Sequence, residues 1–414
     1  MSSSQNWSLL QWQEHEATQV ALWRADSTMT APRRIVIADD SLAADSAYRL
    51  ACEGQAMLWR GDFQNARQLL SALGRRLDKP ARETSAKARH RRAGKEDAKP
   101  VFPHAFHLHR QALAQRARIL SSVMIELDTR WHCALRRAPD WSEACREAWG
   151  EIPADQGAHS VIVPLRELLG ALGAHEWRKK GVALAVPGMP EFSIHPHYGV
   201  FSPVRGEYLD LVAQAPLPAA AQQADAAVWD IGTGTGVLSA LLLHRGVRQV
   251  VATDLSDRAL ACAQDNLQRL GLAQRVSLRK ADLFPEGRAA LVVCNPPWLP
   301  GKASSLLEQA VYDEGSRMLR GFVEGLAAHL LPGGEGWLIL SDLAEHLQLR
   351  SREELLGWID AAGLQVLGRE DIRPRHGKAA DSTDPLHAAR AAELTSLWRL
   401  APGWSRARAP PPPR

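Results

Sequence analysis

The sequence contains no uninterrupted run of about 18 apolar residues, which is the least that a membrane-spanning helix needs. Residues 1–16 also lack the basic start and the apolar stretch of a secretory signal peptide. We therefore expect a soluble protein with no membrane partner. Cysteine is scarce: its five residues are odd in number and form no Cys-x-x-Cys pair. This usage favours reduced thiols in a cytoplasm over disulfides or a zinc site, so we expect a cytoplasmic protein without a metal.

An excess of charge of one sign is also missing, except in one segment. Lys and Arg number 50 against 46 Asp and Glu, a net charge of +4. Residues 79–99 hold eight basic and three acidic side chains, which leaves the rest of the chain close to neutral. The segment has almost no large apolar residues to bury. It is either a solvated linker or a contact for nucleic acid or another acidic partner, and both interpretations stay open.

The 414 residues are enough for two or three domains. Residues 1–180 are predicted to form a mostly helical substrate-recognition domain that contains the basic linker. Its predicted elements are one strand at 34–38 and helices over 63–77, 107–127 and 150–180. A β-hairpin lead-in and an Ala/Gln-rich linker are expected in 181–225, with Gly181 ending the preceding helix. The proline-rich tail, 405–414, is expected to be disordered.

Residues 226–404 alternate between apolar strands and helical segments. Seven strands are predicted, at 228–230, 249–254, 275–278, 289–294, 336–341, 364–373 and 394–400. Helical stretches of crossover length separate most of them. This order predicts an α/β fold with a doubly wound, mostly parallel, seven-stranded Rossmann-like sheet.

Acidic residues and glycines occur where three of these strands end. Asp230 begins the segment Asp-Ile-Gly-Thr-Gly-Thr-Gly between the first strand and its helix. The glycines let a ligand approach the backbone, and the preceding acid suits a cationic amine but would repel a pyrophosphate. Asp254 ends the second strand and could accept from two ribose hydroxyls. Asp282 follows the third strand and could accept from an adenine amino group. Together the three acids match the amine, ribose and adenine of S-adenosylmethionine.

The fourth strand ends in Asn295-Pro296-Pro297-Trp298. Consecutive prolines fix an extended backbone and remove two N–H donors, so nearby carbonyls and the Asn295 side-chain oxygen can accept from a substrate amino group. Trp298 offers a ring on which a planar amide or base can stack. Accepting both amino hydrogens would free the nitrogen lone pair for an electrophilic methyl group. This motif therefore predicts methyl transfer to a planar nitrogen.

In order and spacing, these four motifs resemble the class I S-adenosylmethionine-dependent methyltransferases with an Asn-Pro-Pro-aromatic motif. The resemblance covers about residues 180–400. It implies S-adenosylmethionine as cofactor, with contacts from the glycine loop, the strand-end acids and their neighbours. The implied cofactor-binding residues are Asp230, Gly232, Thr233, Gly234, Gly236, Asp254, Leu255, Asp282, Leu283 and Asn295. The implied catalytic residues are Asn295, Pro296, Pro297 and Trp298.

Two groups within this family share further features with the chain. Phe201, Pro203 and Arg205 resemble a Pro-Arg-acid segment that precedes the core of HemK-type protein glutamine methyltransferases, and could contact substrate. Residues 308–319 resemble the stretch after the catalytic motif of the same group. Residues 199–202 instead resemble the lead-in hairpin of ribosomal RNA guanine-N2 methyltransferases. Trp298 departs from both groups, which prefer Tyr and Phe.

The favoured hypothesis is a HemK-like N-methyltransferase that acts on a protein glutamine amide. A nucleic-acid base methyltransferase, acting on guanine N2 or adenine N6, is the first alternative, and a non-catalytic S-adenosylmethionine-binding module is the second. We expect a protein or RNA substrate as partner, and a monomer or weak oligomer. A loose similarity between residues 37–44 and 252–259 leaves a degenerate second Rossmann half open for the N-terminal domain.

Overall fold

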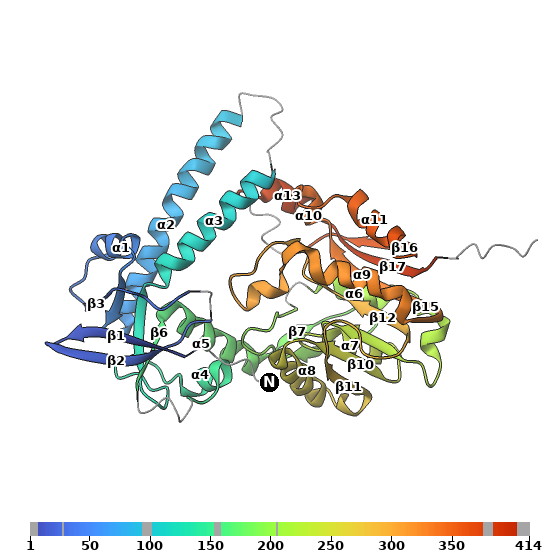
Figure 1. The fold of residues 1–414 in the computed structure, drawn as a ribbon, viewed down its shortest axis with the longest axis horizontal. Helices are drawn as coiled ribbons and strands as arrows, with labels where there is room; N and C mark the ends of the chain where they lie inside the picture. The colour runs from blue at the N-terminus through green and yellow to red at the C-terminus, as the bar shows by residue number, and fades with distance from the viewer. Residues whose placement is uncertain are drawn as a thin grey trace, which may run out of the picture. The chain divides into compact units, whose positions relative to one another are not determined.

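The computed structural model describes residues 7–26, 29–92, 102–152, 159–203, 206–375 and 384–403, with backbone alone for 79–92 and Phe102. The chain divides into two units, Met1–Glu176 and Trp177–Arg414 (Figure 1). Within the described ranges, no helix combines the length and apolar character needed to cross a membrane. The predicted tail, the end of the basic segment (93–99) and Arg205 lie outside the described residues.

The N-terminal unit is built on a six-stranded sheet in the order β1-β2-β6-β5-β4-β3. Strands β3, β4 and β5 are mutually parallel, as are β2 and β6, whereas the pairs β1–β2 and β5–β6 are antiparallel. The strands are β1 (Ser8–Glu14), β2 (Ala17–Trp23), β3 (Ile35–Ala38), β4 (Ala56–Trp59), β5 (Val123–Leu127) and β6 (Val161–Pro164). The helices are α1 (Ala44–Cys52), α2 (Phe63–Arg92), α3 (Phe102–Leu120), α4 (Ser142–Trp149) and α5 (Leu165–Lys180), which crosses the unit boundary.

This sheet corrects the prediction of a single strand in the N-terminal domain, although α1 to α5 still span more residues than its six strands. Residues 123–127 were expected to end a helix, but they form β5, and 161–164 form β6 within a predicted helical stretch. Both strands are almost entirely buried in the middle of the sheet. A short apolar run buried on both faces has no periodicity that distinguishes strand from helix, so tertiary pairing decides.

The predicted linker at 79–99 is also corrected in part, because α2 continues to Arg92. Ala, Arg, Lys and Glu make up most of residues 81–92 and favour helix even without an apolar face. Strands β3, β4 and β5 are parallel neighbours in chain order, with α1 and then α2 and α3 between them, which is the βαβαβ order of a Rossmann half. The acids after β3 bind local backbone: Asp39 accepts from Ser41, and Asp40 from Asp62. The degenerate second Rossmann half therefore stays a prediction for this unit.

The C-terminal unit contains a seven-stranded sheet in the order β11-β10-β9-β12-β15-β17-β16. All paired strands are parallel except β17, which is antiparallel to both neighbours. The strands are β9 (Val228–Ile231), β10 (Val250–Asp254), β11 (Val276–Lys280), β12 (Ala289–Cys294), β15 (Leu330–Ser341), β16 (Leu364–Ile372) and β17 (Thr395–Pro402). The predicted doubly wound, mostly parallel sheet is confirmed.

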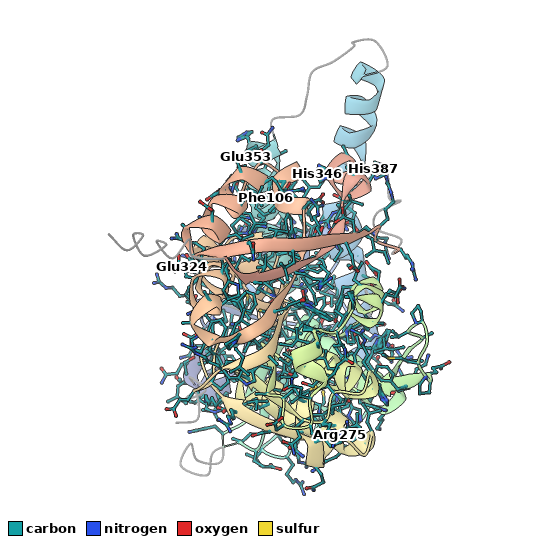
Figure 2. The ribbon with its side chains drawn as sticks, turned by 90° about the vertical axis from the view of Figure 1, so that its right-hand side faces the viewer. Phe106, Arg275, Glu324, His346, Glu353 and His387 are labelled. Atoms are coloured by element: carbon teal, nitrogen blue, oxygen red, sulfur yellow. The ribbon has the colours of Figure 1, made fainter. Side chains whose placement is uncertain are left out.

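Helices cover both faces of this sheet (Figure 1). One hydrophobic cluster joins it to α6 (Glu207–Gln214), α7 (Val237–His244) and α8 (Asp257–Arg269). A second joins it to α9 (Arg317–His329) and α11 (Arg352–Ala361). Neighbouring strand residues alternate between the clusters, as Val293 and Cys294 of β12 do. Burial on both faces explains the continuous apolar runs in the central strands. Farther along, α10 (Leu343–His346) lies beside α13 (His387–Ala392), where Figure 2 labels His346 and His387.

The predicted hairpin is confirmed as β7 (Val182–Leu184) paired antiparallel with β8 (Phe192–Ile194). Gly181 ends α5 as expected, with a φ of +74° and its N–H donated to the Trp177 carbonyl. The expected Ala/Gln linker is wrong for 219–222, which form a 3-10 turn. Ala221 is only 1% exposed in that turn and belongs to the first hydrophobic cluster, because its small side chain allows close packing.

Candidate active site

Four strands of the C-terminal sheet end at one edge, and the predicted site residues follow them. Ile231 of β9 lies opposite Thr253 of β10 on one side and Cys294 of β12 on the other. The next residues, Gly232, Asp254 and Asn295, therefore leave the sheet at the same level. The strand order reverses at β9, and such a switch point opens a crevice at the carboxyl ends of the strands. The structure brings the first three predicted motifs and the Asn-Pro-Pro-Trp motif to this edge.

Asp230 is fully buried near the end of β9. Its Oδ2 atom accepts three hydrogen bonds, from the Thr233 hydroxyl at 2.7 Å and from the Ser239 hydroxyl and backbone N–H at 2.7 and 3.1 Å. Its Oδ1 atom is buried without a hydrogen-bond partner. Burial raises the pKa of Asp230, while the Ser239 and Thr233 hydrogen bonds oppose that rise. The carboxylate thus keeps one oxygen available to a further donor.

The loop after Asp230 uses its glycines for left-handed backbone and for close packing. Gly232 and Gly236 have φ values of +72° and +79°. A Cβ atom on Gly232 would lie 2.6 Å from Cε of Met318, and one on Gly236 would lie 3.2 Å from Cβ of Ala263. The backbone N–H groups of Gly232 and Thr233 donate to the Thr253 carbonyl at 2.9 Å. Larger side chains would strain this loop, which is tied to β10.

Asp254 ends β10 and is partly buried. Its Oδ1 accepts from the Ser256 backbone N–H at 2.9 Å, and its Oδ2 from that of Gly234 at 3.1 Å. Burial raises its pKa, and these backbone hydrogen bonds lower it. Each carboxylate oxygen has two acceptor sites, so capacity remains for hydroxyl donors. Leu255, the adjacent predicted contact, is 50% exposed.

Asp282 has an ion-pair partner that the sequence did not predict. Its side chain is 52% exposed, and the Arg317 guanidinium at the start of α9 donates to it at 2.9 Å. Leu283 follows with a φ of +71°, and its carbonyl accepts from the Thr253 hydroxyl at 2.7 Å. The structure therefore brings α9 to the same edge as β11. An adenine amino group at Asp282 would share the carboxylate with Arg317.

Asn295 follows β12, whose six residues are all buried. The indole N–H of Trp298 donates to Asn295 Oδ1 at 2.9 Å. Because an indole nitrogen can only donate, this contact fixes which side of the Asn295 amide carries the oxygen. Trp298 contacts both hydrophobic clusters of the unit. The motif is thus held by the sheet beneath it and by its own tryptophan.

The chain after the motif folds back toward the loop. Strand β13 (Leu299–Pro300) pairs with β14 (Tyr312–Asp313). The Asp313 carboxylate then accepts from the backbone N–H groups of Met318 and Leu319, each at 3.1 Å, and so caps α9. This connection carries Met318 to Gly232 and Arg317 to Asp282.

Sequence analysis missed three side chains at this edge: Ser239, Arg317 and Tyr208. Ser239 is the only hydroxyl side chain of α7, which is apolar apart from Ser239 and His244, and this pattern could have pointed to it. Burial raises the pKa of Tyr208, and the nearby charge of Asp230 adds to the rise. Of the predicted lead-in residues, Phe201 is 40% exposed and Pro203 is buried. Nothing in the sequence pattern pointed to Tyr208.

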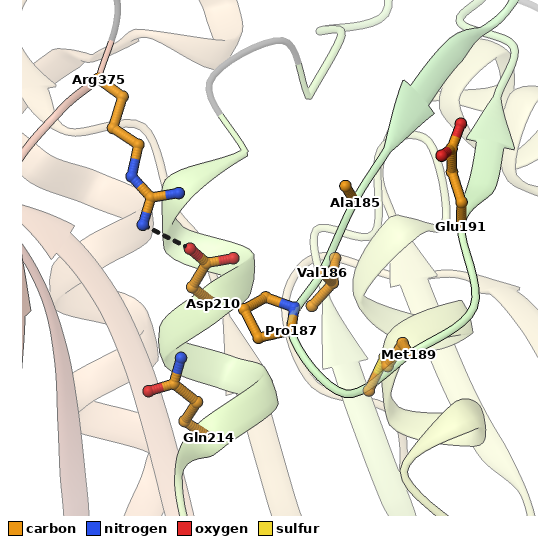
Figure 3. Close-up of a pocket in the computed structure, with 8 residues that line it drawn as sticks. All are labelled: Ala185, Val186, Pro187, Met189, Glu191, Asp210, Gln214 and Arg375. Carbon is orange, nitrogen blue, oxygen red and sulfur yellow. Dashed lines mark ion pairs between the residues drawn. The ribbon is translucent and has the colours of Figure 1, made fainter.

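A cavity of about 510 Å³ lies elsewhere, between the hairpin and α6 (Figure 3). Asp210 and Arg375 form an ion pair at 2.8 Å on its wall. Its lining residues are Ala185, Val186, Pro187, Met189, Glu191, Asp210, Gln214 and Arg375. None of these is a predicted site residue, so the cavity is separate from the motif edge.

The segment that contains this edge of the sheet is similar to a known protein family. The family model described as methyltransferase small domain matches residues 191–351, which include all four motifs. Residues 191–351 are thus similar to a methyltransferase small domain. This finding confirms the resemblance to class I methyltransferases.

Curated relatives match part of the chain. A release factor glutamine methyltransferase of Cereibacter sphaeroides is 34% identical over 163 residues, or 36% of this chain and 56% of that protein. The protein of the same name from Moorella thermoacetica is 41% identical over 115 residues, or 26% and 41% of the two chains. A ribosomal protein uL3 glutamine methyltransferase of Bordetella pertussis is 35% identical over 115 residues, or 26% and 39%. The chain thus spans about half the length of these relatives.

Among solved structures, a ribosomal protein L11 methylase from Lactobacillus delbrueckii subsp. bulgaricus is similar over 48% of this chain and 78% of its own. The TM-score is 0.32 and the sequence identity 19%.

Proposed function

We propose that the protein is an S-adenosylmethionine-dependent N-methyltransferase whose substrate is a glutamine side-chain amide of another protein. The observation that carries the proposal is the position of Asn295. It leaves β12 at the level where Gly232 leaves β9, so an acceptor group at Asn295 would lie beside a ligand of the glycine loop. The glutamine methyltransferases among the relatives support an amide as the acceptor.

The residues at the edge fit the cofactor. The buried and unpartnered Oδ1 of Asp230 suits the cationic amine, which needs an acceptor in a site that excludes water. Asp254 would accept from the ribose hydroxyls, and Asp282 from the adenine amino group, with Arg317 beside it. Thr233, Gly234, Leu255 and Leu283 would line the same site. When bound, the cofactor supplies a methyl group on a positively charged sulfur.

The chain's own residues would act mainly by positioning. Asn295 Oδ1 accepts from Trp298 and keeps one acceptor site, which would hold one hydrogen of the substrate amide. Pro296 and Pro297 have no N–H, so the carbonyls of this segment stay available to the second hydrogen. Two acceptors on one NH₂ group turn its lone pair out of conjugation. The ring of Trp298 would support the planar amide.

The N-terminal unit would recognise the protein substrate, and we place the functional division at residues 1–180, 181–225 and 226–404. We expect a cytoplasmic monomer or weak oligomer that requires no metal. An RNA base is the second candidate acceptor, since the basic segment of 79–99 would suit phosphates. The names of the curated relatives favour the protein.

The proposal is tested by transfer of a tritiated methyl group from the cofactor to a cell extract. We expect the label in a fraction that protease destroys and ribonuclease leaves intact, and N5-methylglutamine after complete digestion. Asn295→Ala should abolish transfer while cofactor affinity, measured by calorimetry, stays nearly unchanged. Gln268→Ala, which removes an exposed amide on α8 of the C-terminal unit, serves as the control.

Label that ribonuclease releases would replace the glutamine proposal with the RNA alternative. Cofactor binding without transfer to any acceptor would identify a non-catalytic binding module instead. Full activity of Asn295→Ala would refute the role of the Asn-Pro-Pro-Trp motif.

A further inference from the structure

The hydrogen bonds of Asp230 are distributed unevenly between its two oxygens. Oδ2 accepts from the Thr233 hydroxyl and from both the backbone N–H and the hydroxyl of Ser239. Oδ1, equally buried, accepts none. A carboxylate that served only to cap α7 would need the backbone N–H alone. The two hydroxyls are additional, and they saturate the oxygen that is turned toward the helix.

These hydroxyls also act on the charge of Asp230. The groups that face it from neighbouring elements are Asp254 on β10, Tyr208 on α6 and Cys294 on β12. None of them is a cation that would stabilise a buried carboxylate. Burial raises the pKa of Asp230 and the charge of Asp254 adds to the rise, while hydrogen bonds from Ser239 and Thr233 lower it. Donation from Ser239 and Thr233 therefore favours the ionised form of Asp230 against the effect of burial.

We propose that Ser239 is a positioning residue for cofactor binding: its hydroxyl, with that of Thr233, occupies Asp230 Oδ2 and leaves Oδ1 as a charged acceptor for the amine of the cofactor. The inference rests on the proposed function, because it assigns the ligand of Oδ1. Substitution of Ser239 by alanine would remove its hydroxyl and keep its backbone N–H, so the role of the hydroxyl can be tested separately.

The test is calorimetric titration of S-adenosylmethionine into the full chain at a series of pH values. Ser239→Ala should weaken cofactor affinity by about tenfold at neutral pH, as expected for the loss of a hydrogen bond to a charged group. The pH below which binding is lost should rise, because Asp230 then takes up a proton more readily. Thr233→Val should change both quantities in the same direction.

Ser396→Ala is the matched control, because it removes another buried serine hydroxyl that donates to a carboxylate, at Asp371 on the far strands. It should lower thermal stability about as much as Ser239→Ala and leave cofactor affinity and its pH dependence unchanged. If Ser239→Ala loses stability but keeps the wild-type affinity and pH profile, Ser239 merely caps the helix and the inference is wrong. Absence of cofactor binding by the wild-type chain would instead overturn the proposed function, and this inference with it.

Discussion

Replacing Trp298 by phenylalanine should reduce methyl transfer chiefly through Asn295. The substitution keeps an aromatic ring in contact with both hydrophobic clusters and removes the indole N–H, which donates to Asn295 Oδ1 at 2.9 Å. Without that donor, the Asn295 amide can turn its nitrogen toward the substrate NH₂ and present no acceptor. A neutral hydrogen bond contributes about 1 kcal/mol net, so we expect kcat to fall about fivefold.

The measurement is steady-state transfer of labelled methyl groups at saturating cofactor, with kcat and both KM values determined separately. We expect kcat to fall while KM for the cofactor stays constant, because Trp298 positions the acceptor and not the nucleoside. Trp358→Phe, on α11, is a control for the loss of indole volume on the same unit and should leave kcat unchanged. An unchanged kcat for Trp298→Phe would refute the argument. A rise in KM for the cofactor with unchanged kcat would show that Trp298 belongs to the cofactor site.

Two further predictions concern stability. Burial raises the pKa of Asp265, but hydrogen bonds from His197, Arg269 and Arg178 outweigh it and lower the pKa from 3.8 to about 2. Asp265 should therefore add about 2 kcal/mol above pH 4, and this should disappear as the pH falls to 2. Urea unfolding of wild type and Asp265→Asn should differ at pH 7 and converge in acid; a constant difference would contradict this. Glu335 accepts from Arg399 at 2.8 and 2.9 Å and from the Trp337 indole, so Glu335→Ala should cost about 3 kcal/mol in urea unfolding. Glu324→Ala, at the surface (Figure 2), should cost almost nothing; equal losses would contradict the burial argument.

The C-terminal sheet could be predicted from sequence because local and tertiary signals agree there. Strand β12 is apolar at every position and is followed by Asn295 and two prolines. The Ser256 and Ser351 hydroxyls accept from backbone N–H groups in the first turns of α8 and α11, as such residues do. In the N-terminal unit the signals conflict. Strand β5 continues an apolar pattern that begins in α3, and only pairing with β4 and β6 separates the two.

The candidate site shows the same division between local and long-range information. Because parallel strands end at one edge of a sheet, the sequence could predict that Asp230, Asp254 and Asn295 lie close together. Partners within the same motif, such as Thr233 and Trp298, could also be predicted, but partners from other segments could not. Arg317 reaches Asp282 across 35 residues, and Ser239 reaches Asp230 from within the next helix. The sequence predicts which groups would carry the chemistry, and the structure adds which groups contact them.

One consequence of this division is that the acceptor side and the cofactor side of the site depend on different donors. Asn295 is oriented by Trp298 within its own motif, over three residues. Asp230 is oriented by Thr233 of the glycine loop and by Ser239 of α7. Each pair lies at its own strand end, β12 or β9, and among the described residues no hydrogen bond joins the two pairs. Substitutions at Trp298 and Ser239 should therefore combine additively, because groups without shared partners seldom couple. A double variant that lost far more, or far less, than the two single losses together would mean that cofactor and acceptor are held by one connected network.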